Sequence, residues 1–104
     1  MTQNDWQRQV ADFMRRHELS HDPATHALDL VSEVGELTKE LLQATDYGQR
    51  PSEFGAGLLE EFGDVLYSLL ALAEVCDVDA DEALESALRK YERRLAERGE
   101  VGSE

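Results

Sequence analysis

The chain has 104 residues, the length of one ordinary domain, and 41% of them are hydrophobic, a globular rather than a disordered composition. Its 23 acidic and 10 basic side chains give a formal charge of −13, which repels phosphate backbones and argues against a nucleic-acid partner. No apolar stretch approaches membrane-spanning length and no signal pattern opens the chain, so we expect a cytoplasmic protein with no membrane contact.

The hydrophobic spacing of the first half predicts two helices. One is expected over residues 5–17, with an apolar face formed by Trp6, Val10, Phe13 and Met14. Asp22 followed by Pro23 is typical of an N-cap with proline at the first helical position, and predicts a second helix over residues 23–45. The apolar stripe of this second helix is Leu30, Val34, Leu37 and Leu41.

The second half predicts two more helices after a connection that contains Gly48 and Pro51. The third begins near Gly57 and has an unusually wide apolar arc, which predicts burial on two sides and hence a subunit interface. The main stripe of this arc is Leu58, Phe62, Val65, Leu69, Leu72 and Cys76, and the residues beside it are Leu59, Leu66 and Leu70. Asp79 with Glu82 indicates the start of a fourth helix that ends near Arg98.

No segment alternates as a strand would, so the fold is expected to be all-α. We expect one helical domain over residues 1–98, arranged as a four-helix bundle or a closely related α-hairpin, and a flexible tail over residues 99–104. Cys76 is the only cysteine, and its apolar surroundings predict a buried structural thiol.

Two carboxylate pairs carry the chemical signal. Glu33 and Glu36 on the second helix are spaced i, i+3, and Glu61 and Asp64 on the third helix have the same spacing, so each pair projects from one helix face. Both pairs lie on the same side of their apolar stripes. In an antiparallel helix pair they therefore either converge or both point away, and the sequence does not select between these. An ordinary solvated acidic face would also explain either pair alone.

Converging carboxylates need a counter-charge, so either some are protonated or a cation binds. An oxygen-only set of ligands suits Mg²⁺, or Mn²⁺, rather than zinc. Magnesium usually joins a few protein carboxylates to substrate phosphates, which indicates phosphoryl or nucleotidyl chemistry.

These motifs stand within "LVSEVGELTKEL" and "EEFGDVLYSL". Together with the opening "DWQRQVADFMRRH" and the closing "LRKYERR", they resemble the MazG-like family of all-α nucleoside triphosphate pyrophosphohydrolases over nearly the whole chain. The resemblance implies a bundle of MazG-like type, a homodimer or homotetramer, and hydrolysis of nucleoside triphosphates to monophosphate and pyrophosphate. House-cleaning of non-standard nucleotides is one role that this activity would fit.

The resemblance also assigns residues. It implies Mg²⁺, or Mn²⁺, held by Glu33, Glu36, Glu61 and Asp64. The family's first motif usually opens with two adjacent glutamates, and here Ser32 replaces the first, which puts any outer role of that position in doubt. Glu36 and Glu61 are the expected catalytic carboxylates. Glu36 would orient or deprotonate the attacking water, with Glu40 one turn on as a helper.

Substrate contacts are expected from basic and aromatic side chains. Lys90 and Arg93 would neutralise the phosphates, as a similar segment does in relatives, and Lys39 is a further candidate. Solvated positive charge near a helix C-terminus is the alternative for these cations. The expected base contacts are Trp6, Tyr47 and Phe54.

Gly35 and Gly63 interrupt helices beside the carboxylates. They would permit a close approach of helices or leave room for a ligand, while simple tight packing explains them equally well.

Two other functions stay open, an enzyme similar to phosphoribosyl-ATP pyrophosphatase and a non-catalytic acidic helical module that binds a protein partner. The charge of −13 favours the module, whereas the matched carboxylate pairs favour an enzyme. A di-iron bundle would need Glu-x-x-His on two helices. The chain has one such string, in the turn before Asp22, so His17, His21 and His26 are expected at the surface or in turns.

Overall fold

The computed structural model describes residues 5–49 and 55–102, and the described residues form four helices and no strand. The helices are α1 (Asp5–His17), α2 (Pro23–Ala44), α3 (Ala56–Val75) and α4 (Ala80–Arg98). The all-α prediction is confirmed, and each expected helix end lies at or next to the observed one. Within the described residues, no helix combines the length and the apolar character needed to cross a membrane.

Capping residues explain where the helices begin and end. The Asp22 carboxylate accepts the Thr25 N–H at 2.8 Å, and Pro23 follows as the first residue of α2. Asp79 accepts the Glu82 N–H at 3.2 Å at the start of α4. That helix ends at Gly99, whose φ of 77° is the left-handed conformation common at helix C-termini.

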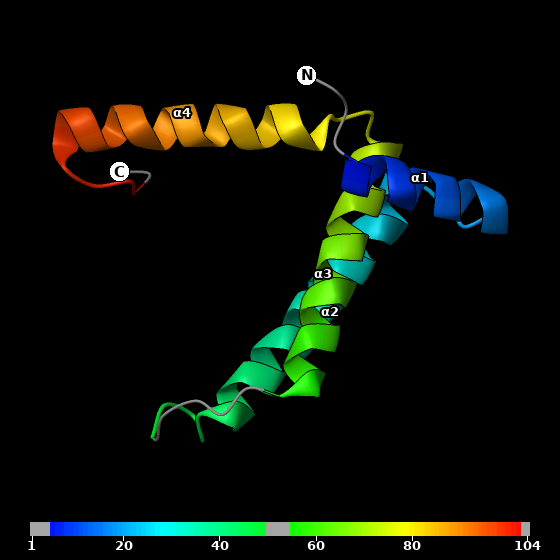
Figure 1. Cartoon of the computed structure of the whole chain (residues 1–104), viewed down its shortest axis with the longest axis horizontal. Helices are drawn as coiled ribbons and strands as arrows, with labels where there is room; N and C mark the ends of the chain where they lie inside the picture. The colour runs from blue at the N-terminus through cyan, green and yellow to red at the C-terminus, as the bar shows by residue number, and fades with distance from the viewer. Residues whose placement is uncertain (1–4, 50–54, 103–104) are drawn as a thin grey trace.

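The helices are arranged as a hairpin with an arm (Figure 1). α2 and α3 run antiparallel and pack side by side, and α1 packs across α3. α4 departs in another direction and lies against none of these helices along its length. A single chain therefore does not close a four-helix core. Its radius of gyration is 16.5 Å, whereas a compact chain of this length would have about 13 Å.

The hydrophobic core within one chain is correspondingly small. Its buried apolar residues, among those that the structure describes, are Met14, Leu70 and Ala71. Large apolar residues from the expected stripes are left uncovered, including Val34 (43% exposed) on α2 and Phe62 (58%) on α3. α4 exposes Leu84, Leu88 and Leu95.

Two expectations about single residues were wrong. Cys76 is exposed, because α4 turns away from the end of α3 and leaves it uncovered. His26 is buried, with 6% of its surface exposed. Its Nε2 accepts the N–H of His21 at 3.0 Å, so this histidine stabilises the turn that leads into α2 from inside the molecule.

Candidate metal centre

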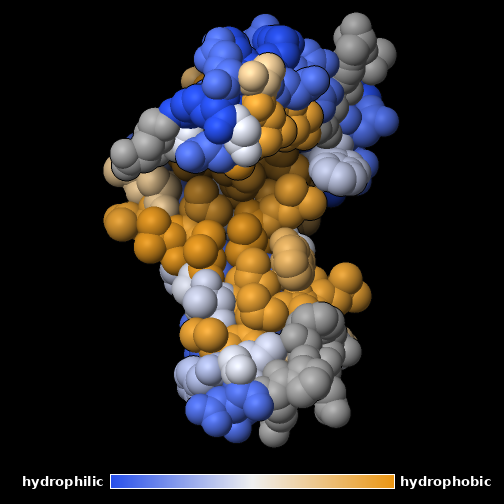
Figure 2. Space-filling model, turned by 90° about the vertical axis from the view of Figure 1, so that its left-hand side faces the viewer, coloured by the Kyte–Doolittle hydropathy of each residue, from blue (hydrophilic) through white to orange (hydrophobic). Residues whose placement is uncertain are grey.

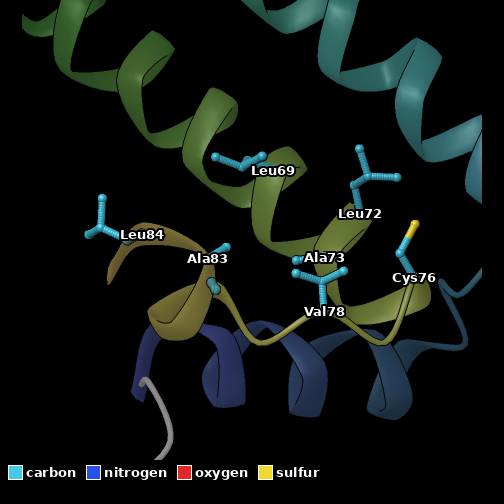
Figure 3. A pocket seen from close by; sticks show the side chains of 8 residues that line it. Leu69, Leu72, Ala73, Cys76, Val78, Ala83 and Leu84 are labelled. Atoms are coloured by element: carbon cyan, nitrogen blue, oxygen red, sulfur yellow. The ribbon is translucent and has the colours of Figure 1, made fainter. Parts of the chain in front are cut away.

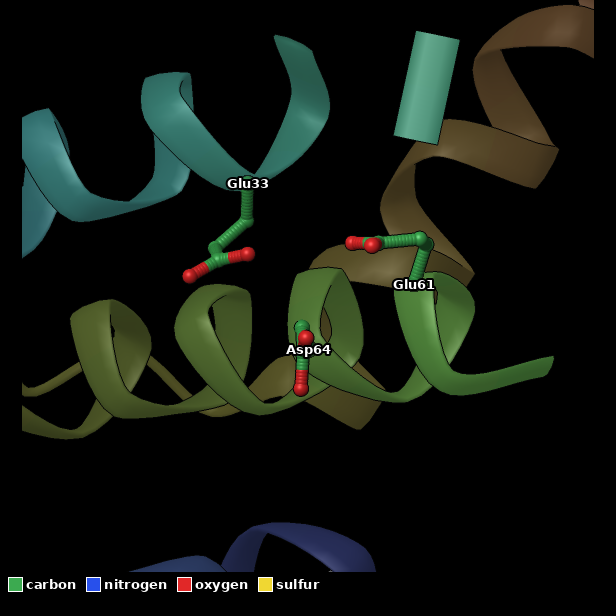
Figure 4. Close-up of side chains that lie close together, drawn as sticks. All are labelled: Glu33, Glu61 and Asp64. Carbon is green, nitrogen blue, oxygen red and sulfur yellow. The ribbon is translucent and has the colours of Figure 1, made fainter. Parts of the chain in front are cut away.

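Three carboxylates from the two hairpin helices converge. Glu33 extends from α2 toward α3, while Glu61 and Asp64 project from α3 (Figure 4). One oxygen of each can be chosen so that all three lie within 4.8 Å of one another. Glu33 and Glu61 are half-buried, and Asp64 is exposed. The antiparallel hairpin thus brings Glu33 of the first pair to the Glu61–Asp64 pair, a convergence that the sequence alone left undecided.

The convergence follows from how α2 faces α3. The half-buried and buried residues of α2 mark its contact face, and apart from Ala27 they recur every three or four positions: His26, Leu30, Glu33, Leu37, Glu40 and Ala44. On α3, Glu61 is half-buried between Leu58 and Val65, which are half-buried too. Glu33 and Glu61 are therefore part of the helix contact. One edge of each apolar stripe is exposed to solvent, and acidic side chains lie in the contact between the helices.

This placement raises the pKa of Glu61. The main cause is its partial removal from water, and the negative charges of Asp64, Glu36, Glu33 and Glu40 raise it further, in that order. The ion pairs between described residues lie elsewhere, as Asp5–Arg8, Asp12–Arg15 and Glu85–Arg89. A divalent cation fits the donor set, because the ligands are all oxygens and their mutual repulsion would be relieved by positive charge.

Glu36 and Glu40 lie around this cluster in different ways. Glu36 is exposed and stands outside the group of three, although its charge reaches Glu61. Glu40 is half-buried, and a Cβ added to Gly57 would lie 3.0 Å from its Oε2. The Glu40 carboxylate thus occupies space that Gly57 leaves free at the first turn of α3, where a helix dipole favours an anion.

Two of the three expected phosphate contacts are not brought to the carboxylates within one chain. Lys90 and Arg93 belong to α4, which does not pack against the hairpin. The Lys90 Nζ lies 5.1 Å from the centre of the Tyr91 ring, a cation–π arrangement. Lys39 is exposed on α2, three residues beyond Glu36.

The expected base contacts fall in three different places. Trp6 is 59% exposed and lines a pocket of about 220 Å³ with Tyr67 and Gly63, the residue that precedes Asp64. Tyr47 is 67% exposed in the turn after α2, with a φ of 57°. Phe54 lies outside the described residues. Trp6 is therefore the candidate that shares a pocket with a neighbour of the carboxylate cluster.

Comparisons with known proteins bear on the family and the fold. The sequence model of a family described as "MazG nucleotide pyrophosphohydrolase domain" matches residues 21–98. The YpjD protein of Bacillus subtilis is 30% identical over 101 residues, which cover 93% of this chain and 89% of that protein. A crystal structure of YpjD from the same organism matches with a TM-score of 0.70 at 29% identity, over 88% of this chain and 93% of that one.

Mammalian proteins named dCTP pyrophosphatase 1 are also similar. The human protein is 38% identical over 105 residues, covering 91% of this chain and 62% of the human one. The mouse protein is 40% identical over 100 residues, covering 89% of this chain and 58% of the mouse one. The present chain thus spans about three-fifths of the length of these relatives.

Proposed function

The chain belongs to the MazG nucleotide pyrophosphohydrolase family, and we propose that it hydrolyses a nucleoside triphosphate to the monophosphate and pyrophosphate in a Mg²⁺-dependent reaction. The observation that carries this proposal is the convergence of Glu33, Glu61 and Asp64 from two helices. Mn²⁺ would serve the same oxygen ligands. Because human and mouse relatives are named for dCTP, this nucleotide is the first substrate to test.

The residues proposed to hold the cation are Glu33, Glu36, Glu61 and Asp64. A bound divalent cation polarises phosphoryl oxygens and lowers the pKa of water. Glu36 suits the role of orienting or deprotonating the attacking water, because it is exposed and lies near enough for its charge to raise the pKa of Glu61. Glu61 is the second proposed catalytic carboxylate, and Glu40 of α2, whose carboxylate lies next to Gly57, adds a further negative charge near it.

Substrate contacts complete the proposal. Trp6 would stack on the base in the pocket next to Gly63, and Tyr47 is a second exposed aromatic. Lys90, Arg93 and Lys39 would neutralise the phosphates. Because α4 stands away from the hairpin of its own chain, Lys90 and Arg93 would reach the carboxylates of another copy.

A homodimer or homotetramer is proposed because a single chain leaves much of its surface exposed. The chain exposes 7666 Å², whereas a compact monomer of 11.7 kDa would expose about 5,900 Å². The difference of about 1,800 Å² exceeds the ~800 Å² that each partner buries in a standard interface. Figure 2 shows a broad hydrophobic area below the polar outer surface of α4.

The α3–α4 corner belongs to the same uncovered surface. It forms a pocket of about 500 Å³ lined by apolar side chains (Figure 3). Leu69 and Leu72 of α3 and Val78 of the connection line one part of this pocket, and Leu84 of α4 lines another. A second copy, which carries the same apolar surfaces, would cover this corner and the exposed side of α3.

The test is pyrophosphate release from a panel of ribo- and deoxyribonucleotides that begins with dCTP and includes phosphoribosyl-ATP. We expect release that requires Mg²⁺. Glu61→Gln should lower kcat by at least about 100-fold, because it removes a charge from the cation site, while the helical circular dichroism stays unchanged. Glu60→Gln changes the adjacent exposed glutamate and should retain activity.

Retained activity in Glu61→Gln would overturn the assignment of the site. Release from none of the nucleotides would favour the alternative of a non-catalytic acidic module, which the charge of −13 also fits. A house-cleaning role predicts a higher kcat/KM for modified nucleotides than for their standard counterparts, measured in the same panel.

A further inference from the structure

Gln7 is a polar residue at the meeting point of three helices. It belongs to α1, and only 4% of its surface is exposed. Its Nε2 donates to the carbonyl oxygen of Val78 at 2.8 Å and to Oε1 of Glu74 at 3.2 Å. Its Oε1 accepts the backbone N–H of Ala80 at 2.8 Å. One carboxamide therefore contacts the end of α3, the connection after it and the start of α4.

The bond to Ala80 completes the cap of α4. Ala80 is the first residue of that helix, and its N–H is one of those that have no partner inside a helix. Asp79, the residue directly before α4, accepts the Glu82 N–H. Gln7 satisfies the Ala80 N–H from a position 73 residues earlier. No local pattern of the sequence signals such a long-range cap.

The direction of α4 depends on this junction. Within one chain α4 does not pack against the other helices along its length, so the contacts that orient it in that chain lie where it begins. The connection from α3 to α4 spans only residues 76–79. We propose that Gln7 is a positioning residue whose carboxamide sets the direction in which α4 leaves the molecule.

The consequence for function rests on the proposed activity, in which α4 presents Lys90 and Arg93 to the phosphates. Arg93 lies 13 residues beyond Ala80, or about 20 Å along the helix. A rotation of roughly 10° at the junction would displace it by about 3.5 Å at that rise per residue. Errors of about 1 Å in the placement of a substrate-positioning group can cost about 100-fold in rate.

The chemistry of the junction requires a carboxamide. The site needs a donor for the Val78 carbonyl and an acceptor for the Ala80 N–H, and a neutral amide supplies both. Glu74, Asp77 and Asp79 line the adjoining pocket, so an ionised carboxylate in place of Gln7 would meet acidic groups and the Val78 carbonyl. A leucine would satisfy neither backbone group.

The direction of α4 is measured by a spin-label distance. Cysteines replace the exposed Gln43 on α2 and Glu92 on α4 in a Cys76→Ser background, and each labelled protein is diluted with unlabelled protein so that only distances within one chain contribute. We expect one narrow population with Gln7 present. Gln7→Leu should shift the mean by about 3 Å or broaden the distribution, in line with the rotation estimated above. Gln49→Leu, at an exposed glutamine, should change neither.

Gln7→Glu provides a second measurement in a nearly isosteric side chain. When the introduced carboxyl group is protonated, its O–H can donate to the Val78 carbonyl and its carbonyl oxygen can accept the Ala80 N–H. The narrow distance should therefore return at acidic pH and be lost at neutral pH. The starting protein at the same pH values controls for titration of Glu74, Asp77 and Asp79. An unchanged distance distribution in Gln7→Glu at both pH values would overturn the proposal, whether or not Gln7→Leu folds.

Kinetics separate this inference from the proposed function. Gln7→Leu should raise KM, with no further increase in a Lys90→Ala/Arg93→Ala background, because the two changes act through the same helix. If the increases in KM are additive, the inference that Gln7 acts through Lys90 and Arg93 is wrong. If the starting protein releases no pyrophosphate, the proposed function fails, and the distance measurement still decides whether Gln7 directs α4.

Discussion

At the residue scale, the fold places Glu61 partly out of water and close to other negative charges, which is unfavourable for its ionised form. Its pKa is raised by its partial removal from water and by the negative charges of Asp64, Glu36, Glu33 and Glu40. A carboxylate whose pKa is higher in the folded than in the unfolded chain destabilises the metal-free fold when it ionises. That loss disappears as the pH falls through the raised pKa. The repulsion is the physical reason to expect a cation between α2 and α3.

Metal-free protein is therefore expected to become more thermally stable as the pH falls from neutral toward the pKa of Glu61, which lies above its ordinary 4.5. Glu61→Gln should lack this part of the pH dependence. The pKa of Asp22 is lowered by its hydrogen bonds with Thr25, so its stabilising effect is lost only at a pH below 3.8. Thermal melts in the presence of a chelator, between neutral pH and pH 3.8, measure the contribution of Glu61 to this pH dependence.

Added Mg²⁺ should raise the melting temperature at neutral pH and raise it less in acid, because protons compete for the same oxygens. Glu60→Gln is the matched control and should keep both responses. Equal pH dependence in the parent protein and in Glu61→Gln would contradict the electrostatic account.

At the scale of helices, the glycines next to the carboxylates do not serve close packing within one chain, which was one of the explanations that the sequence left open. A Cβ added at Gly35 or Gly63 would meet no described atom within 4 Å, so neither glycine brings two helices of one chain together. Gly57, which the sequence marked only as the start of a helix, is the one whose missing side chain accommodates Glu40. Open space around Gly63 is consistent with the pocket that Trp6 lines.

Gly35→Ala should raise the free energy of unfolding by about 0.5–1 kcal/mol, because alanine is the better helix former and nothing within the chain opposes its methyl group. Gly99→Ala should have the opposite sign, since the φ of Gly99 is 77°. Urea denaturation measures both. Lost activity in Gly35→Ala, with the stability gained, would show that the glycine leaves room for a ligand.

At the scale of the whole molecule, the chain is open. Among the described residues only three apolar ones are buried, and the apolar sides of α3 and α4 remain uncovered. The wide apolar arc of α3 was expected to be buried on two sides, and one chain covers one of them, with Leu70 inside and Leu59 and Leu66 outside. Uncovered apolar surface of this extent is typical of protein–protein interfaces.

Leu69→Lys should dissociate the proposed oligomer, because Leu69 is 48% exposed and lines the apolar pocket at the α3–α4 corner. It also lines a second apolar pocket that α3 forms with Leu59, Phe62 and Leu66. Val101→Lys, an equally drastic change in the tail, should leave it assembled. Raised salt should tighten assembly in the parent protein, because it screens the repulsion between copies that each carry −13. Sedimentation velocity measures all three. A monomeric parent protein would contradict the proposal.

The features that could be predicted from sequence are those set by neighbouring residues. The four helices could be predicted from the periodic apolar positions and from the caps at Asp22–Pro23 and Asp79. The acidic groups of the candidate site could be predicted from the i, i+3 spacing of the carboxylate pairs. These depend on local backbone geometry and hydrogen bonding, which a short stretch of sequence contains in full.

Only the tertiary structure decided how those elements meet. The carboxylates converge because α2 and α3 face each other along the edges of their apolar stripes, a rotation that the helical period does not contain. The burial of His26, the exposure of Cys76 and the departure of α4 from the junction at Gln7 have the same origin. Each depends on contacts between residues far apart in the chain, whose geometry is determined by packing and not by the sequence near them.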